Sequence, residues 1–293
     1  MSNHNHSHTG NIRFAFFLNI LFTIVEIIGG FLTNSVAILA DAVHDLGDSL
    51  SLGAAWFFEK YSKKPKNKTY TYGYKRFSLI GALINAVVLI GGTVYVLTEI
   101  VDRLFEPSEV MAEGMIWLAV AGVAMNGLAV LRLKGNSSLN SRMVMLHLLE
   151  DVLGWIAVLI AAITIYFTNW HSIDAWLSLA ISIWVLYNAI RGLVEVMKVI
   201  LQATPKEFDY KKVRKQLSEI KNLEDVHDIH VWSLDGEYHV ASMHAVVGEK
   251  VVDQQQSEIK KAIREIFKNW DINHVTIEVE NDSEQEDCEY HDC

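Results

Sequence analysis

Six stretches of mostly apolar residues, each about 20 residues long, account for most of the chain before position 202. Apolar runs of this length are typical of helices that cross a lipid bilayer. The sequence therefore predicts an α-helical membrane protein with six transmembrane helices, near 12–32, 36–58, 77–101, 114–133, 140–167 and 173–200. The first residues lack a signal-peptide pattern, so the first stretch is expected to stay in place as a span.

The loops between these stretches differ in charge, and the difference predicts an orientation. The loop after the second stretch carries Lys60, Lys63, Lys64, Lys66, Lys68, Lys75 and Arg76, and the loop after the fourth carries Arg132, Lys134 and Arg142. The remaining connections are short or acidic. Because positively charged loops stay in the cytoplasm, both termini are expected on the cytoplasmic side of a bacterial inner (plasma) membrane.

Past Pro205 the composition changes to that of a small soluble α/β domain. Helical spacing covers 208–220 and 251–267, whereas strand-like segments cover 226–234, 238–247 and 275–279. The resulting order α-β-β-α-β predicts a ferredoxin-like, metallochaperone-like cytoplasmic domain. A domain of this size has a small core, so we expect it to pair two chains into a homodimer.

The chain thus divides into four predicted parts. These are a His-containing cytoplasmic tail (1–10), a transmembrane domain (11–202), the cytoplasmic α/β domain (203–280) and an acidic Cys/His tail (281–293). The net charge of −10 argues against nucleic acid as a partner. Both cysteines, Cys288 and Cys293, fall in the last six residues, so no disulfide framework is implied.

A His and an Asp stand four residues apart in two of the apolar stretches, as His44 and Asp48 and again as His147 and Asp151. Residues four apart share one face of a helix, so each helix presents an imidazole and a carboxylate together. Two such helices face to face would supply two nitrogens and two oxygens, a set that suits tetrahedral Zn²⁺. Ionisable groups at membrane depth are costly, which favours a functional role over interhelical hydrogen bonding alone.

Neighbouring acids are expected to support this site rather than to ligate the metal. Asp41 lies on the same stripe as His44, where it could relay protons or organise the site, and Glu150 could do the same beside Asp151. Asp45 points about 100° away from the stripe. The apolar residues of the fifth stretch begin at Met143, but the helix is expected to begin earlier, near Ser138. An earlier start brings His147 and Asp151 deeper into the membrane.

A second metal site is predicted in the cytoplasmic domain, from His230, His244, His274 and Glu280. Strand alternation places His230 and His244 together on the sheet face that the helices leave uncovered, with His274 and Glu280 on or beside the third strand. Half-exposed surface histidines are the alternative interpretation, and His227 and His239 are expected to be bystanders. In the terminal tail, Cys288, His291 and Cys293 are weak candidates that would add ligands to another site or capture metal transiently.

Several phrases in this sequence resemble one known family. They are Asn34-Ser35-Val36-Ala37-Ile38-Leu39-Ala40-Asp41-Ala42, Tyr72-Gly73-Tyr74-Lys75-Arg76 and His227-Asp228-Ile229-His230-Val231-Trp232-Ser233-Leu234. Together with six spans and paired His-x-x-x-Asp, they resemble the cation diffusion facilitators, proton-coupled zinc exporters that include the ZnT transporters. The resemblance implies that His44, Asp48, His147 and Asp151 form the transport site. Lys75 stands where that family often has a His, so no metal site is expected in its loop.

These observations predict proton-coupled efflux of Zn²⁺ from the cytoplasm by alternating access, with Zn²⁺ also a candidate regulatory ligand of the cytoplasmic domain. Transport of Mn²⁺, Fe²⁺, Co²⁺ or Cd²⁺ is an alternative, because affinity order alone does not exclude these ions. A metal sensor that does not transport is another alternative. The ligands at membrane depth argue against it, because a sensor has no need of a costly intramembrane site. An intramembrane hydrolase would need a general base and an open coordination position, and the chain has no His-Glu-x-x-His, so we expect no enzyme.

Overall fold

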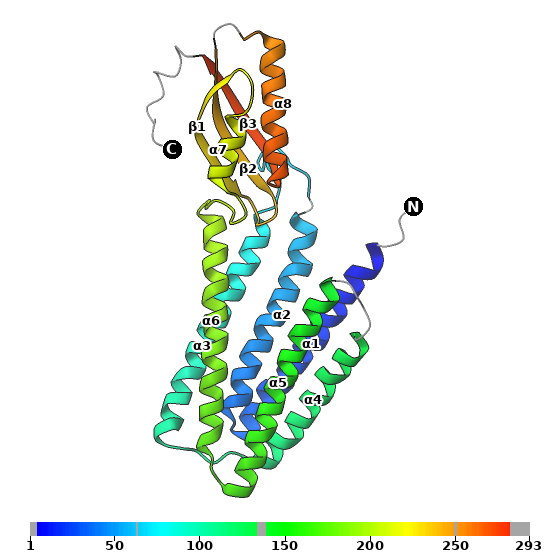
Figure 1. Cartoon of the computed structure of the whole chain (residues 1–293). Helices are drawn as coiled ribbons and strands as arrows, with labels where there is room; N and C mark the ends of the chain where they lie inside the picture. Colours follow the sequence, from blue (N-terminus) through cyan, green and yellow to red (C-terminus); the bar gives the residue numbers. More distant parts are fainter. Residues whose placement is uncertain (1–4, 63, 134–138, 249–250, 282–293) are drawn as a thin grey trace. The chain divides into compact units, whose positions relative to one another are not determined.

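The computed structural model describes residues 5–62, 64–133, 139–248 and 251–281 (Figure 1). Its first six elements are long helices: α1 (Asn5–Thr33), α2 (Val36–Ser62), α3 (Phe77–Phe105), α4 (Ala112–Leu133), α5 (Leu139–Thr168) and α6 (Ser172–Ile200). Each helix contains one predicted apolar stretch and extends beyond it. The extension is longest in α1, which begins inside the segment predicted as a polar tail. Helical hydrogen bonding is cooperative, so it continues past the apolar residues that reveal the helix in the sequence.

Four of these helices contain segments long and apolar enough to cross a membrane: Phe77–Phe105, Ala112–Leu131, Leu148–Thr168 and Ser172–Ile200. In α1 the apolar segment found among the residues whose side chains are described is the shorter Asn19–Thr33. The apolar character of α2 is interrupted by three aspartates between positions 41 and 48. The chain therefore has a helical membrane domain with four apolar helices, and the count of six spans stays a prediction.

The start of α2 is fixed to α6 by a buried carboxylate, that of Asp174. One of its oxygens accepts a hydrogen bond from the Ser35 hydroxyl at 2.5 Å, and the other accepts from the backbone N–H of Val36 at 2.8 Å. In the next turn of α6, Ser178 donates to the carbonyl of Val36 at 2.9 Å. The first N–H groups of a helix have no partner within the helix, so this carboxylate both satisfies them and sets where α2 begins.

Helix α5 packs against α4 around a fully buried tryptophan, Trp155. Gly122 on α4 makes room for the indole, because a Cβ added there would lie 2.2 Å from the ring. Phe22 of α1 meets the same indole edge to face, with ring centroids 5.8 Å apart. This contact ties α1, α4 and α5 together. It lies about one helical turn after Asp151 on α5.

The C-terminal part of the chain contains α7 (Tyr210–Leu217), β1 (Leu223–Ser233), β2 (His239–Val247), α8 (Asp253–Asn269) and β3 (Ile272–Asn281). The predicted order α-β-β-α-β is therefore confirmed. The sheet order is β1-β2-β3, with β1 and β2 antiparallel and β2 and β3 parallel. A parallel pair needs a crossover, and α8 supplies it. Apolar residues of α7 and α8 pack with Ala241, Met243 and Ala245, so the helices cover one sheet face and leave the other available.

Residues 62–79, which connect α2 to α3, group with the C-terminal part from Val194 onward, whereas the rest of the helices form a separate compact unit. Within the C-terminal unit, Asp209 caps α7 by accepting a hydrogen bond from the N–H of Lys212 at 3.1 Å. This bond, supported by the Lys212 ammonium, lowers the pKa of the Asp209 carboxyl. The hairpin turn between β1 and β2 uses Gly236 at φ +97°, as the Asp-Gly signal predicts.

Candidate metal centres

His44 and Asp48 lie one above the other on α2, as the spacing predicts. The Nε2 of His44 is 3.7 Å from an Oδ of Asp48, and the two side chains are 24% and 28% exposed. A separation of 3.7 Å is too long for a hydrogen bond but leaves both atoms able to reach one ion between them. The pair therefore presents one nitrogen and one oxygen ligand to the same point beside the helix.

The face of α2 that carries this pair lies against α5. A Cβ added at Gly154 of α5 would lie 3.7 Å from an Oδ of Asp41, so the Asp41 side chain reaches to within van der Waals range of α5 there. The Asp41 carboxylate interacts electrostatically with His44, Asp48 and Asp151. Three of the four predicted transport-site residues, His44, Asp48 and Asp151, therefore lie close enough to Asp41 to interact with it electrostatically. The fourth, His147, belongs to α5, but its side chain lies outside the described residues.

A second acidic pair lies on a different side of α2. Glu26 of α1 is 1% exposed, and it interacts electrostatically with Asp45, Asp41 and Asp151, most strongly with Asp45. Neither oxygen of Glu26 has an N–H or hydroxyl donor among the described residues. Nearby, Asn19 of α1 donates to the Asp45 carbonyl at 3.3 Å and to the Ser49 hydroxyl at 3.1 Å, so it joins α1 to α2.

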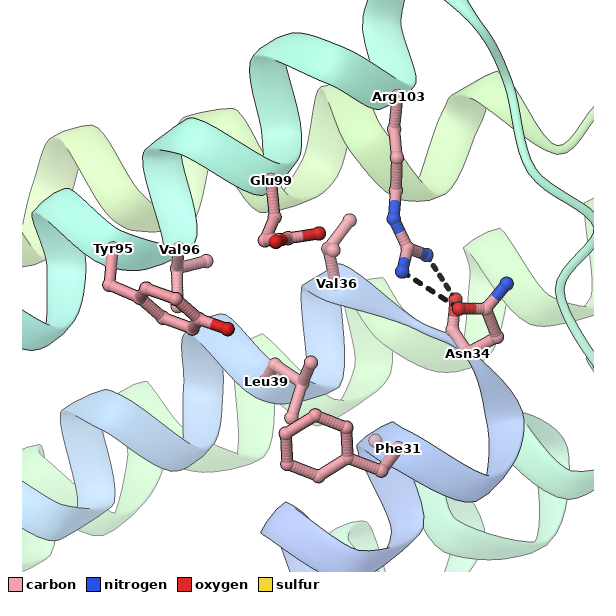
Figure 2. Close-up of a pocket in the computed structure, with 9 residues that line it drawn as sticks. Phe31, Asn34, Val36, Leu39, Tyr95, Val96, Glu99 and Arg103 are labelled. Carbon is pink, nitrogen blue, oxygen red and sulfur yellow. Dashed lines mark hydrogen bonds between the residues drawn. The ribbon is translucent and has the colours of Figure 1, made fainter.

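The α1–α2 turn and α3 enclose a cavity of about 140 Å³ (Figure 2). Its lining is Gly30, Phe31, Asn34, Val36, Leu39, Tyr95, Val96, Glu99 and Arg103. Arg103 points to Asn34 and donates to its carbonyl and, at 2.7 Å, to its amide oxygen. The cavity has one carboxylate, one guanidinium and no imidazole. Leu39, the lining residue nearest to His44 in the sequence, precedes it by five residues, about 7.5 Å along a helix, and neither His44 nor Asp48 lines the cavity.

The C-terminal unit contains a second ligand cluster, formed by His227 (β1), His244 (β2) and Glu280 (β3). One ligand atom from each of the three lies within 4.8 Å of the other two. The Nδ1 of His244 is hydrogen-bonded to Glu280, and the Nε2 of His227 is 3.4 Å from the second oxygen of that carboxylate. His227 is 6% exposed, yet neither ring nitrogen has a hydrogen-bond partner among the described residues. A buried imidazole that makes no hydrogen bond among the described residues and lies beside a second imidazole and a carboxylate offers one nitrogen to a shared ion, and the three ligands fit Zn²⁺.

A bulge in β1 creates this cluster. Asp228 has φ +52°, and the pairing with β2 shifts between His227 and His230. Before the shift His227 pairs with His244, and after it His230 pairs with Ser242. An extra residue in one strand resets the alternation of side chains, so His227 reaches the same sheet face as His244.

The predicted cytoplasmic set is therefore brought together only in part. His244 and Glu280 lie in the cluster, but His230 is 54% exposed and sits 2.7 Å from Asp228. His274 pairs with Val240, four positions along β2 from His244, which places it about 13 Å away. His227, which was expected to be a bystander, instead lies in the cluster with His244 and Glu280. The signal available in the sequence was Asp228, a residue type that tolerates positive φ inside a strand. Cys288, His291 and Cys293 lie outside the described residues.

Two family models together match nearly the whole chain. Residues 12–201 match the cation efflux transmembrane domain, and residues 205–282 match the cytoplasmic domain of cation efflux proteins. The chain belongs to the cation efflux family. This assignment confirms the resemblance to the cation diffusion facilitators and makes the protein a membrane-embedded metal cation transporter, not an enzyme.

Curated relatives of this cation efflux protein span almost its full length. A "Cadmium, cobalt and zinc/H(+)-K(+) antiporter" of Bacillus velezensis is 34% identical over 97% of the chain and 94% of the relative. The "Metal cation efflux system protein CzcD" of Cupriavidus metallidurans is 32% identical over 94% of the chain and 89% of the relative. The "Zinc transporter ZitB" of Pectobacterium atrosepticum is 33% identical over 98% and 92%.

Proposed function

We propose that this cation efflux protein exports Zn²⁺ from the cytoplasm in exchange for protons, at a site made by His44, Asp48, His147 and Asp151. The observation that carries the proposal is the His44–Asp48 pair on α2. Asp41 of the same helix approaches Gly154 of α5 and interacts electrostatically with Asp151. A second His-Asp pair on α5 would complete a tetrahedral set of two nitrogens and two oxygens.

The ligand types explain why metal and proton would exchange at this site. Zn²⁺ binds the neutral imidazole and the ionised carboxylate, so binding competes with protonation of the same lone pairs. Four protein ligands leave no coordinated water to activate, which suits carriage rather than hydrolysis. The name of the Bacillus velezensis relative includes H⁺, which supports proton coupling, and it includes cadmium and cobalt, which makes these ions the second candidate substrates.

An orientation and a dimeric assembly belong to the same proposal. The Lys-rich segment between α2 and α3 supports a cytoplasmic location for that loop and for both termini. Bacterial relatives support the plasma membrane as the location. We propose that the C-terminal domains pair two chains, and that Zn²⁺ at His227, His244 and Glu280 strengthens this pairing when cytoplasmic metal rises.

The test is metal flux in liposomes that contain the purified protein and an internal Zn²⁺-sensitive dye, with an imposed pH gradient. Asp48→Asn and Asp151→Asn should each reduce Zn²⁺ flux by at least about tenfold, because each removes a charged ligand from a four-ligand site. Asp102→Asn, at an exposed position of α3, makes the same chemical change and should leave flux unaltered. Full flux in both site variants would refute the site, and the absence of flux in the native protein with Zn²⁺, Cd²⁺ and Co²⁺ would refute transport.

A further inference from the structure

The segment that links α2 to α3 concentrates positive charge in an acidic protein. Between 62 and 79 the sequence has six Lys and Arg residues and no Asp or Glu, whereas the whole chain has a net charge of −10. The segment leads directly into α3, one of the four apolar helices. The basic residues are therefore held by the chain next to the surface of the membrane.

This basic segment has a defined fold, which Asn67 organises. Its side-chain oxygen accepts hydrogen bonds from the N–H groups of Thr69, at 2.9 Å, and Tyr70, at 2.7 Å. Its amide nitrogen donates to the Tyr74 hydroxyl at 2.8 Å. The turn is closed by Gly73, with φ +82°, whose N–H donates to the Tyr70 carbonyl at 2.9 Å. Because Asn67 stands between Lys66 and Lys68, it also fixes the backbone from which these lysines extend.

Aromatic rings form the apolar part of the same turn. Tyr70 and Tyr74 have ring centroids 4.6 Å apart, and each also meets Phe77, the first residue of α3, at 5.7 and 5.4 Å. Tyr70 is 42% exposed. Tyrosine is enriched at the level of lipid headgroups, where its ring is in an apolar medium and its hydroxyl in a wet one.

The second half of the segment is held by the C-terminal domain. The ammonium of Lys75 is 3.7 Å from an Oδ of Asp235 and 4.6 Å from the centre of the Tyr238 ring. Tyr72 meets His274 edge to face at 6.0 Å. Lys66 and Lys68, by contrast, are exposed and have no ion pair with any described residue. The structure thus uses Lys75 internally, and also Lys64, whose ammonium lies 5.8 Å from the centre of the Tyr74 ring, and it leaves Lys66 and Lys68 available.

We propose that Lys66 and Lys68 bind the phosphates of anionic phospholipids in the membrane leaflet next to the α2–α3 segment. The proposal rests on the proposed orientation, in which that leaflet is the cytoplasmic one. Juxtamembrane lysines are attracted to anionic lipid surfaces, and each contributes up to about a fivefold gain in association. The Asn67 turn lowers the entropic cost of binding because the backbone around both lysines is already ordered.

The experiment compares two spin-labelled lipids, phosphatidylglycerol and phosphatidylcholine, around the full chain in phosphatidylcholine nanodiscs. The native protein should prefer the anionic lipid, and the preference should weaken as salt rises. In the double variant Lys66→Gln/Lys68→Gln the preference should fall at least twofold. Lys66→Arg/Lys68→Arg, which keeps the charges, should retain it. Lys261→Gln/Lys268→Gln removes two exposed charges from α8 and should also retain it.

An unchanged preference in Lys66→Gln/Lys68→Gln would overturn the proposal, as would an equal loss in the α8 control. Because this assay measures lipid association without a metal gradient, its outcome is independent of whether Zn²⁺ is the substrate. The orientation is tested separately, by labelling Lys68→Cys in intact cells with a membrane-impermeant maleimide after both native cysteines are replaced by serine. Labelling from outside would assign the bound lipid to the outer leaflet and refute the cytoplasmic location.

Discussion

Replacing His227 by leucine should have opposite effects on stability with and without metal. The imidazole is 6% exposed and both of its nitrogens lack hydrogen-bond partners among the described residues. A buried polar group left unpaired costs about 1–3 kcal/mol. Leucine fills a similar volume without that penalty, and although Glu280 loses the contact at 3.4 Å with His227, it keeps its hydrogen bond to His244. In the presence of a chelator, His227→Leu should therefore stabilise the sheet by about 1 kcal/mol or leave it unchanged.

With Zn²⁺ the same substitution should destabilise the sheet relative to the native protein. A ligand at 100 times its dissociation constant stabilises the folded state by about 2.7 kcal/mol, which equals about a 100-fold change in an opening equilibrium. The three residues of the cluster come from three different strands, so an ion held by them resists opening of β1, β2 and β3 together. Losing one of three protein ligands should remove most of this gain.

Hydrogen–deuterium exchange on the full-length protein measures both effects locally, because peptides from β1 and β2 report the sheet without interference from metal bound among the membrane helices. Native peptides should gain about 100-fold protection with Zn²⁺, and His227→Leu peptides should gain almost none. His274→Leu is the matched control, since His274 lies outside the cluster. Equal zinc protection in His227→Leu and native protein would refute the assignment, and so would loss of protection in His274→Leu.

Other predictions concern the helices and the cap of α7. Gly154→Leu should lower Zn²⁺ flux at least about tenfold, because its Cβ would already be in van der Waals contact with Asp41 at 3.7 Å and the rest of the side chain would press on that carboxylate. Gly127→Leu, whose Cβ would meet no atom within 4 Å, should leave the flux unchanged. Asp174→Asn replaces a buried acceptor by a donor and should destabilise the helices by about 1–3 kcal/mol, measured as a lower unfolding midpoint in detergent. The lowered pKa of Asp209 means that its cap contributes above the ordinary Asp pKa and fades as pH falls through the lowered value, so Asp209→Asn should reduce the acid sensitivity of α7 in hydrogen exchange.

The helices and the His44–Asp48 pair could be predicted from the sequence because both depend on local geometry. A helix puts residues four apart on one face whatever surrounds it, and apolar length marks where a helix meets lipid. The same reasoning missed the true ends of α1, because polar flanking residues join a helix at little cost once it has formed. The predicted count of six spans stays a prediction, since the three aspartates of α2 lower its apolar character.

The cytoplasmic cluster could be predicted only in part because it depends on register between strands. Alternation along β1 correctly separates Ile229 and Val231, which are buried, from His230. It fails at Asp228, where a single residue with φ +52° shifts the pairing and turns His227 toward His244. His274 has the right parity but the wrong position along its strand. Predicting the cluster on the sheet therefore requires the register of three strands, whereas predicting the His-Asp pair on a helix requires only the spacing of two residues.

The two acidic sides of α2 show what spacing leaves undetermined. Asp41, His44 and Asp48 share one side, and the contact at Gly154 shows that this side faces α5. Asp45, expected to lie about 100° from that stripe, interacts electrostatically with Asp41, Asp151 and Asp48 and also lies beside the buried Glu26 of α1. Helical periodicity separates these two groups and says nothing about which helix covers each. One helix thus carries a His-Asp pair and a carboxylate that lies beside the buried Glu26 of α1, so a movement of α2 relative to α1 would also change the surroundings of Glu26.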